Sequence, residues 1–296
     1  MSVESSACEN RDVPTFTDEQ GVVITYYVWP VERPRAVIQL AHGVGEYAQR
    51  YAGLAAALNA AGYTVYADDH RGHGQTGLDQ WQGDRSKLGH LGPGGLRATV
   101  ESVRQLTRIA RDEHPDAPLV LLGHSWGSLM AQMIVNRHAD EYDALVLTGT
   151  AYRMFGSMAS GDLNKRHKHL GTTGFEWLSR DIAVHAAAAA DPLMVDAKVM
   201  TLFGVADSLR LLGRPAKALP RDLPLLIQIG SDDPLGGEKS VRKLAAAYER
   251  RSGLTDVTVH VYPEARHEVF NELNKDEVIA DLTGWLDARF AGSAPA

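Results

Sequence analysis

The sequence predicts an α/β protein, with a mainly parallel β-sheet, helices on both faces and a helical cap inserted over it. Short apolar runs that suit buried strands alternate with segments whose apolar residues recur at helical spacing. This alternation stops over residues 151–219, which hold helical fragments, aromatic residues and glycines, and it resumes afterwards. We therefore expect a core built from residues 1–150 and 220–296, with flexible tails at 1–18 and 291–296, and a cap insertion at 151–219.

Three apolar strands and two helices are expected in the first part of the core. A helix rich in alanine covers residues 51–61 and ends at Gly62, a residue type that favours helix termination. A second helix starts near Leu96 and keeps its apolar residues at helical spacing up to Pro115. The strands are predicted at residues 37–41, 63–67 and 119–122.

The same alternation extends towards the C-terminus. Apolar residues from Leu129 to Ile134 share one face of a helix. Ligands of such sheets bind beyond the carboxyl ends of the strands, so the residues that follow each strand are the ones to search for chemistry. Further strands are predicted at residues 144–147, 225–229 and 257–261, and further helices at residues 241–248 and 279–285.

Composition and charge limit the partners and the location of the protein. The 296 residues carry a formal net charge of -7, which offers no basic surface for nucleic-acid phosphates, so we expect a small neutral substrate. Cys8 is the only cysteine, which excludes a disulfide framework, and no cluster of histidines and carboxylates suggests a metal. The first residues lack the pattern of a secretory signal, which favours a cytoplasmic location.

The segment GHSWG at residues 123–127 matches the pattern G-x-S-x-G. The pattern alone is weakly specific, but here it follows a predicted strand and precedes a predicted helix, as a nucleophile elbow requires. Such a tight turn lifts the serine hydroxyl above the end of the sheet, and its glycines avoid collisions with the neighbouring strand and helix. Ser125 is therefore the candidate nucleophile.

A serine nucleophile needs a histidine base and a carboxylate that orients the histidine. In α/β-hydrolases the chain order is serine, acid, histidine. Two later strands lead into the segments GSDDPLGG and YPEARHEVFNE, which makes Asp233 and His267 the candidates. Asp232 stays a rival, because spacing alone cannot separate two neighbours on one loop. The chain order disfavours four other histidines near strand ends: His42, His70, His73 and His124.

Acyl transfer through a tetrahedral intermediate also needs hydrogen-bond donors for the oxyanion. In an elbow of this type one donor is the backbone N–H of the residue after the nucleophile, here Trp126. The second comes from the loop after an early strand, where HGVG makes the N–H of Val44 the candidate. Without a triad this segment would be interpreted as an ordinary glycine-rich turn.

Six segments, in this order and spacing, resemble the monoacylglycerol lipase and lysophospholipase-like serine hydrolases of the α/β-hydrolase superfamily: HGVGEY, DDHRGHGQT, GHSWG, GFEWLSRD with DPL, GSDDPL and RHEVFNE. The likeness covers about residues 20–290. It implies a cap that shapes an apolar pocket for the acyl or alcohol group. It implies that Ser125 is the nucleophile, Asp233 the triad acid and His267 the base. It also implies that the backbone N–H groups of Val44 and Trp126 are the oxyanion donors.

Three positions depart from the pattern of that family. Tyr47 stands where the family usually has histidine, Trp126 replaces a methionine of the elbow, and Ser128 replaces a glycine. These departures concern the substrate rather than the reaction. The ring of Trp126 either narrows the pocket beside the nucleophile or packs in the core beneath the cap.

These features predict a serine ester hydrolase that acts through an acyl-enzyme on monoacylglycerol or a similar lipid ester, without a cofactor. A carboxylesterase or lactonase for a non-lipid ester, or a peptidase, is an alternative on the same triad. An alternative of another class is a ligand-binding protein that keeps the triad and turns over slowly. Eight apolar cap residues are candidates for the substrate pocket: Met154, Phe155, Met158, Phe175, Trp177, Met200, Leu202 and Phe203.

The charge of the cap differs in sign from that of the whole chain. Residues 151–219 hold nine basic and six acidic residues. This excess favours transient contact with an anionic membrane surface, although a solvated face explains it as well.

Overall fold

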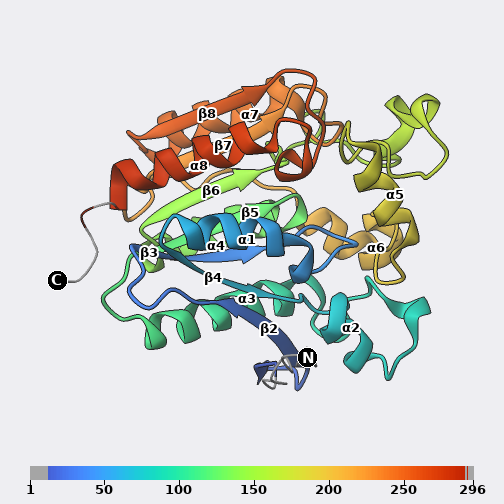
Figure 1. Cartoon of the computed structure of the whole chain (residues 1–296), viewed down its shortest axis with the longest axis horizontal. Helices are drawn as coiled ribbons and strands as arrows, with labels where there is room; N and C mark the ends of the chain where they lie inside the picture. Colours follow the sequence, from blue (N-terminus) through green and yellow to red (C-terminus); the bar gives the residue numbers. More distant parts are fainter. Residues whose placement is uncertain (1–12, 291, 293–296) are drawn as a thin grey trace, which may run out of the picture.

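The computed structural model describes residues 13–290 and residue 292, and an eight-stranded sheet forms its centre (Figure 1). The strands are β1 Thr15–Thr17, β2 Val23–Trp29, β3 Ala36–Ala41, β4 Tyr63–Asp68, β5 Leu119–His124, β6 Ala144–Thr148, β7 Leu225–Gly230 and β8 Val257–Tyr262. Their order across the sheet is β1-β2-β4-β3-β5-β6-β7-β8. The strands from β3 to β8 pair in parallel, whereas β1 and β2 are antiparallel to their neighbours.

Helices cover both faces of the sheet, because successive residues of a buried strand point to opposite sides. The core helices are α1 Ala52–Ala60, α2 Gly74–Gln80, α3 Gly95–Glu113, α4 Trp126–His138, α7 Gly237–Ala247 and α8 Lys275–Phe290. In β5, Leu119 and Leu121 share a buried cluster with residues of α3, α4 and α7, whereas Val120 and Leu122 share one with residues of α1 and α8. Each such buried side chain stabilises the fold by about 1.5–3 kcal/mol.

The strands and helices that the sequence predicts in the core are present, and two strands and one helix add to them. The additions are β1, β2 and α2. The predicted flexible tail over residues 1–18 does not hold from Thr15 onwards, because β1 pairs with β2. The buried Asp18 also accepts hydrogen bonds from two nearby backbone N–H groups and pairs with Arg71. Cys8 and the tail residues 1–12, 291 and 293–296 lie outside the described residues.

The cap lies between β6 and β7, beyond the carboxyl ends of the parallel strands (Figure 1). It holds the helices α5 Ile182–Ala190 and α6 Val199–Arg210, with short 3-10 turns before them and no strand over residues 151–219. Its backbone contacts the loops of the core, since the N–H of Glu268 donates to the carbonyl of Leu178 at 2.7 Å. Among the residues that the structure describes, no helix combines the length and the apolar character needed to cross a membrane.

Candidate active site

Ser125 lies in the sharp turn between β5 and α4. Its φ of 51° and ψ of -122° hold a non-glycine residue in a rarely populated region of backbone conformation. The turn is so tight that a Cβ at Gly123 would approach the carbonyl oxygen of Gly127 to 2.6 Å, and a Cβ at Gly127 would approach that of Ala41 to 2.1 Å. Lack of space therefore requires glycine at both positions.

His267 and Asp233 form a buried pair after β8 and β7. Nδ1 of His267 lies 2.9 Å from Oδ1 of Asp233, and the two side chains are 1% and 0% exposed. The backbone N–H of Leu235 also donates to Oδ1 of Asp233, at 2.8 Å, which fixes the carboxylate. The side chain of Asp232 is 44% exposed and pairs with Arg166 at 3.0 Å. The structure thus brings Asp233, and not Asp232, to the histidine.

Ser125 and His267 line the same pocket. Because the carboxylate of Asp233 accepts from Nδ1, the neutral imidazole carries its proton there and keeps a lone pair on Nε2. Nε2 is buried and forms no hydrogen bond with any described residue, the hydroxyl of Ser125 included. Such contacts are often long in unliganded enzymes and shorten when substrate binds.

The environment of His267 favours its charged form. Burial lowers the pKa of the imidazole, but the charge and hydrogen bond of Asp233 outweigh burial. The charges of Glu268 and Glu46 act in the same direction, so the pKa of His267 lies above its ordinary value. An imidazole in this setting can accept a proton from a hydroxyl and hold it while a tetrahedral intermediate forms.

The candidate oxyanion donors are the backbone N–H groups of Val44 and Trp126. Within the described part of the chain, the N–H groups of Val44 and Trp126 donate to no backbone or side-chain oxygen. The loop that carries Val44 lies against the elbow, since a Cβ at Gly43 would be 3.0 Å from the Cβ of Ser125. Both N–H groups therefore belong to segments that adjoin the nucleophile.

His42 fixes the peptide that carries the N–H of Val44. The backbone N–H of His70 donates to Nε2 of His42 at 3.0 Å, so the ring proton sits on Nδ1. Nδ1 then donates to the carbonyl oxygen of Gly43 at 2.7 Å. Because C=O and N–H of a trans peptide point in opposite directions, this bond aims the N–H of Val44 away from His42.

A buried ion cluster borders the pocket and was not predicted from the sequence. Arg50 donates to Glu46 at 2.7 Å and to the two carboxylate oxygens of Glu268 at 2.7 and 3.0 Å. Glu46 also accepts from the N–H of Gly43 at 2.6 Å. Burial raises the pKa of Glu46, whereas Arg50 overcomes burial and lowers the pKa of Glu268. The cluster connects the oxyanion loop, residues 42–45, to Glu268, the residue after His267. Its only signal in the sequence was the glutamate that directly follows each of these two segments, Glu46 and Glu268.

The cap closes the pocket. The enclosed space is only about 10 Å³, room for about one water molecule. Of the eight apolar cap candidates, Phe175 and Trp177 line it, whereas Phe155 and Met200 are 80% and 54% exposed. The other four candidates do not line it. The cap residues at the pocket are Phe175, Trp177, Leu178, Met194, Val195 and Ala197.

Trp126 packs in the core rather than against substrate. Its ring is 1% exposed and is absent from the pocket lining. The ring centroid lies 5.2 Å from that of His73 and 4.8 Å from that of Phe203 in α6. Of the two roles that the sequence allows for this residue, packing beneath the cap is the one present. No group of three or more histidines, cysteines and carboxylates among the described residues is placed to hold a metal ion.

Comparisons with known proteins agree with this arrangement. A family model described as serine aminopeptidase, S33 (Hydrolase_4) matches residues 32–274. The monoacylglycerol lipase of Mycolicibacterium smegmatis is 36% identical over 291 residues, which cover 93% of this chain and 97% of that protein. The monoglyceride lipase of Mus musculus is 27% identical, with 96% and 93% of the two chains covered. A carboxyl esterase structure from Bacillus coagulans superposes with a TM-score of 0.80 at 24% identity, over 93% of this chain and 97% of that one, and shares the fold.

The match of the family model extends over most of the chain, and the solved esterase structure shares its overall fold. The chain therefore belongs to the α/β-hydrolases of the serine aminopeptidase S33 family.

Proposed function

We propose that this protein is a serine ester hydrolase that acts through an acyl-enzyme on monoacylglycerols or similar lipid esters. The observation that carries the proposal is the buried hydrogen bond of 2.9 Å between His267 and Asp233, beside Ser125 in one pocket. The identity to the monoacylglycerol lipase of M. smegmatis, 36% along nearly the whole chain, supports the substrate class.

The proposed reaction has two steps. Oγ of Ser125 attacks the ester carbonyl while Nε2 of His267 takes the hydroxyl proton, and the N–H groups of Val44 and Trp126 bind the oxyanion. The tetrahedral intermediate expels the alcohol, which leaves with the proton from His267. A water molecule then attacks the acyl-enzyme, His267 takes its proton, and the acid is released as Ser125 is restored. Asp233 stays ionised and stabilises the imidazolium.

The pocket lining supports an ester with one apolar and one polar part. Apolar cap side chains such as Phe175 and Met194 line it on the cap side. Glu46, Arg50 and Glu268 supply charged groups on the core side. An acyl chain suits the first group of residues and a hydroxylated alcohol the second, because polar groups of a buried ligand need partners.

The experiment that tests the proposal is hydrolysis of long-chain monoacylglycerol by the wild type and by Ser125→Ala. Release of fatty acid is expected to fall by several orders of magnitude in the variant, while the thermal unfolding temperature stays within a few degrees. Labelling with a fluorophosphonate is expected in the wild type and not in Ser125→Ala. Equal turnover in the two proteins would overturn the mechanism.

A substrate panel separates this proposal from the alternatives on the same triad. The family description names an aminopeptidase, which makes aminoacyl amides the most informative rival substrates, followed by short aryl esters and lactones. Turnover of amides or lactones well above that of monoacylglycerols would replace the lipid ester as substrate. The alternative of a slow ligand-binding protein predicts a different result, namely fast labelling by the fluorophosphonate with negligible turnover of every ester.

The cap also offers a surface for transient contact with a membrane. Phe155 and Ile182 are 80% and 74% exposed, on a segment with an excess of basic residues. Apolar side chains that enter the interface, together with cations near anionic lipids, favour such contact. Sedimentation with anionic vesicles tests it. A Phe155→Ser, Ile182→Ser variant is expected to bind less, and equal binding would exclude the cap as the contact.

A further inference from the structure

A groove distinct from the active-site pocket concentrates positive charge on an acidic protein. It lies between α3, α4 and the segment after α6 and has a volume of about 660 Å³. Among its lining residues is one carboxylate, that of Glu101, whereas the whole chain has a net charge of -7. We name this feature the arginine groove after the six arginines that line it: Arg97, Arg104, Arg137, Arg153, Arg210 and Arg214.

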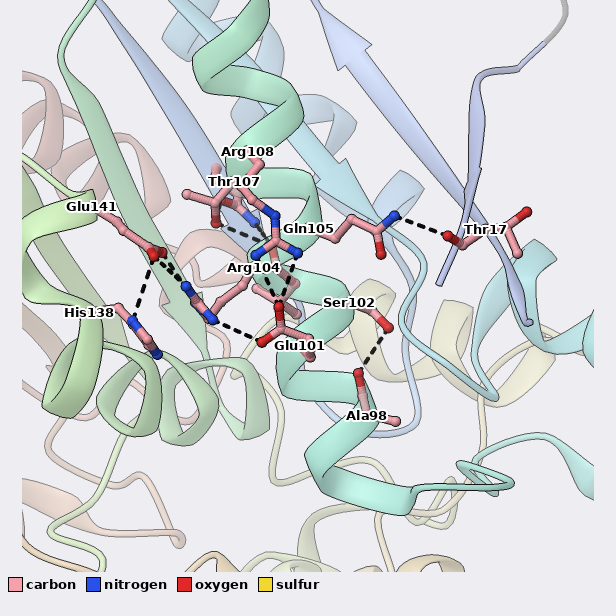
Figure 2. A network of polar contacts seen from close by, with 12 residues as sticks. Thr17, Ala98, Glu101, Ser102, Arg104, Gln105, Thr107, Arg108, His138 and Glu141 are labelled. Atoms are coloured by element: carbon pink, nitrogen blue, oxygen red, sulfur yellow. Dashed lines mark hydrogen bonds and ion pairs between the residues drawn. The ribbon is translucent and has the colours of Figure 1, made fainter. Parts of the chain in front are cut away.

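The acids near the groove are already engaged with other cations. Arg104 lies between Glu101 and Glu141 and donates to both (Figure 2). Glu101 also accepts from Arg108 at 3.0 Å, and Glu141 lies 3.6 Å from the ring of His138 (Figure 2). Two carboxylates thus face two guanidinium groups, those of Arg104 and Arg108, as well as the ring of His138. They have no charge left to neutralise the rest of the groove.

Among the described residues, four of the six guanidinium groups have no carboxylate within ion-pair distance. Arg210 pairs with Asp207 at 2.5 Å, and Arg104 pairs with Glu101 and Glu141. One of the remaining four, Arg137, lies in the last turn of α4, where the helix dipole favours a cation. Like charges in one groove repel each other unless an anion lies between them. Within residues 13–290 and 292, no ion pair is formed by Arg97, Arg137, Arg153 and Arg214.

Arg153 is a second, independent observation that points to an anion as the ligand of the groove. Its side chain is buried, with the residue 3% exposed, yet its acceptors are the neutral oxygens of Gln132 and Leu211, at 3.2 and 2.9 Å. Its Nη2 adjoins the groove wall, since a Cβ at Gly213 would lie 3.1 Å away. Buried charges are normally paired, because removing a cation from water is costly. An anion in the groove would supply the partner.

The chain holds the groove in shape. Nδ2 of Asn136 donates to the carbonyl of Arg214 at 2.9 Å, and its Oδ1 accepts from the N–H of Ala216 at 2.7 Å. The end of α4 therefore fixes the loop that carries Arg214. The walls also include the apolar side chains of Met133 and Leu212, and the volume of the groove is typical of small-molecule sites.

We propose that the arginine groove binds a small molecule that carries a diphosphate or triphosphate group. Guanidinium groups donate in forked pairs that match phosphate oxygens, and a polyphosphate brings several negative charges to balance four cations. A single carboxylate or sulfate lacks that charge. The apolar walls leave room for an organic body. The site is independent of the proposed hydrolase activity, because none of the six arginines lines the active-site pocket.

Binding of inorganic pyrophosphate, tripolyphosphate and ATP to the full chain tests the proposal, by titration calorimetry and by the shift in the unfolding temperature. All three are expected to bind and to raise the unfolding temperature, more weakly as salt increases, because salt screens the attraction. Sulfate at equal ionic strength is the control. A shift that is no larger than that with sulfate would overturn the proposal.

Two double variants locate the site. Arg137→Gln, Arg214→Gln removes two exposed groove cations and is expected to weaken pyrophosphate binding at least tenfold. The matched control Arg33→Gln, Arg250→Gln removes two exposed arginines outside the groove and is expected to bind as the wild type does. Equal affinity in the two double variants would refute the site, as would capture on phosphatidic-acid vesicles without any binding of the soluble phosphates. Ester turnover serves as a check that both variants fold.

Discussion

Replacing Gly127 by alanine tests the geometry of the elbow. The new Cβ would lie 2.1 Å from the carbonyl oxygen of Ala41 and 2.5 Å from that of His42. An unstrained contact between such atoms needs roughly 3.3 Å, so α4 and the end of β3 must separate by roughly 1 Å. Overpacking costs about 1–3 kcal/mol and occasionally more. We expect a loss at the upper end, about 3 kcal/mol, because both neighbours are backbone and cannot rotate away.

Urea unfolding followed by circular dichroism measures this loss, with Gly284→Ala as the matched control. Gly284 lies inside α8 with no atom near the position of its Cβ, so alanine there is expected to stabilise the protein by about 0.5–1 kcal/mol. Ester turnover is a second readout, because His42 adjoins the oxyanion loop and its displacement moves the N–H of Val44. Unchanged stability and turnover in Gly127→Ala would refute the account of the elbow.

Three further predictions concern the triad and the cap. Asp233→Asn is expected to lower kcat by about 10⁴-fold, because the amide favours the wrong tautomer of His267, whereas Asp232→Asn leaves kcat within a few-fold; a larger loss at Asp232 would reverse the assignment. Turnover is expected to rise with pH through a midpoint above the ordinary pKa of histidine, and Asp233→Asn is expected to lower that midpoint. The raised pKa of His267 stabilises the fold fully below the pKa of the unfolded state, and this stabilisation is lost as pH rises through the folded pKa. The difference in unfolding free energy between the two proteins should therefore shrink as pH rises, and a pH-independent difference would contradict this. Tyr47→Phe removes a hydrogen bond of 2.7 Å to Asp191 in the cap. The variant is expected to react faster with a bulky fluorophosphonate, and to gain less with a small one, because the bulky reagent needs the cap to open further. Equal effects on both reagents would show that this contact does not slow opening of the cap.

Short, mostly apolar runs made most of the sheet predictable. Residues of β3, β5 and β7 are buried on both faces, and such strands consist mainly of apolar residues, here with one glutamine each in β3 and β7, Gln39 and Gln228. β2 was missed although its valine, isoleucine, tyrosine and tryptophan residues favour a strand. Its antiparallel pairing with β4 depends on contacts across the sheet, which the local pattern does not contain.

The candidate site shows where sequence patterns lose resolution. Motifs located the elbow and the histidine, but the spacings of the two adjacent aspartates to the other motifs differ by only one residue, too little to choose between them. Only the direction of each side chain separates them, and Asp233 points to His267 while Asp232 points to Arg166. The groove cation Arg153 was likewise invisible as a special residue, because burial without a counter-ion is a property of the tertiary structure.

The closed pocket constrains how the proposed substrate enters. A pocket of about 10 Å³ cannot hold a monoacylglycerol, since small-molecule sites occupy roughly 300–1,000 Å³, so the cap must move before turnover. The cap is joined to the oxyanion loop at Gly45, whose carbonyl accepts from the N–H of Val195 at 2.9 Å. The two peptides that flank Gly43 are held by other side chains: His42 donates to the carbonyl oxygen of Gly43, in the peptide that carries the N–H of Val44, and Glu46 accepts from the N–H of Gly43. The contact with the cap is thus made at Gly45, whereas the oxyanion donor, the N–H of Val44, is fixed through the carbonyl of Gly43. The cap can therefore open while the N–H of Val44 stays directed at the nucleophile.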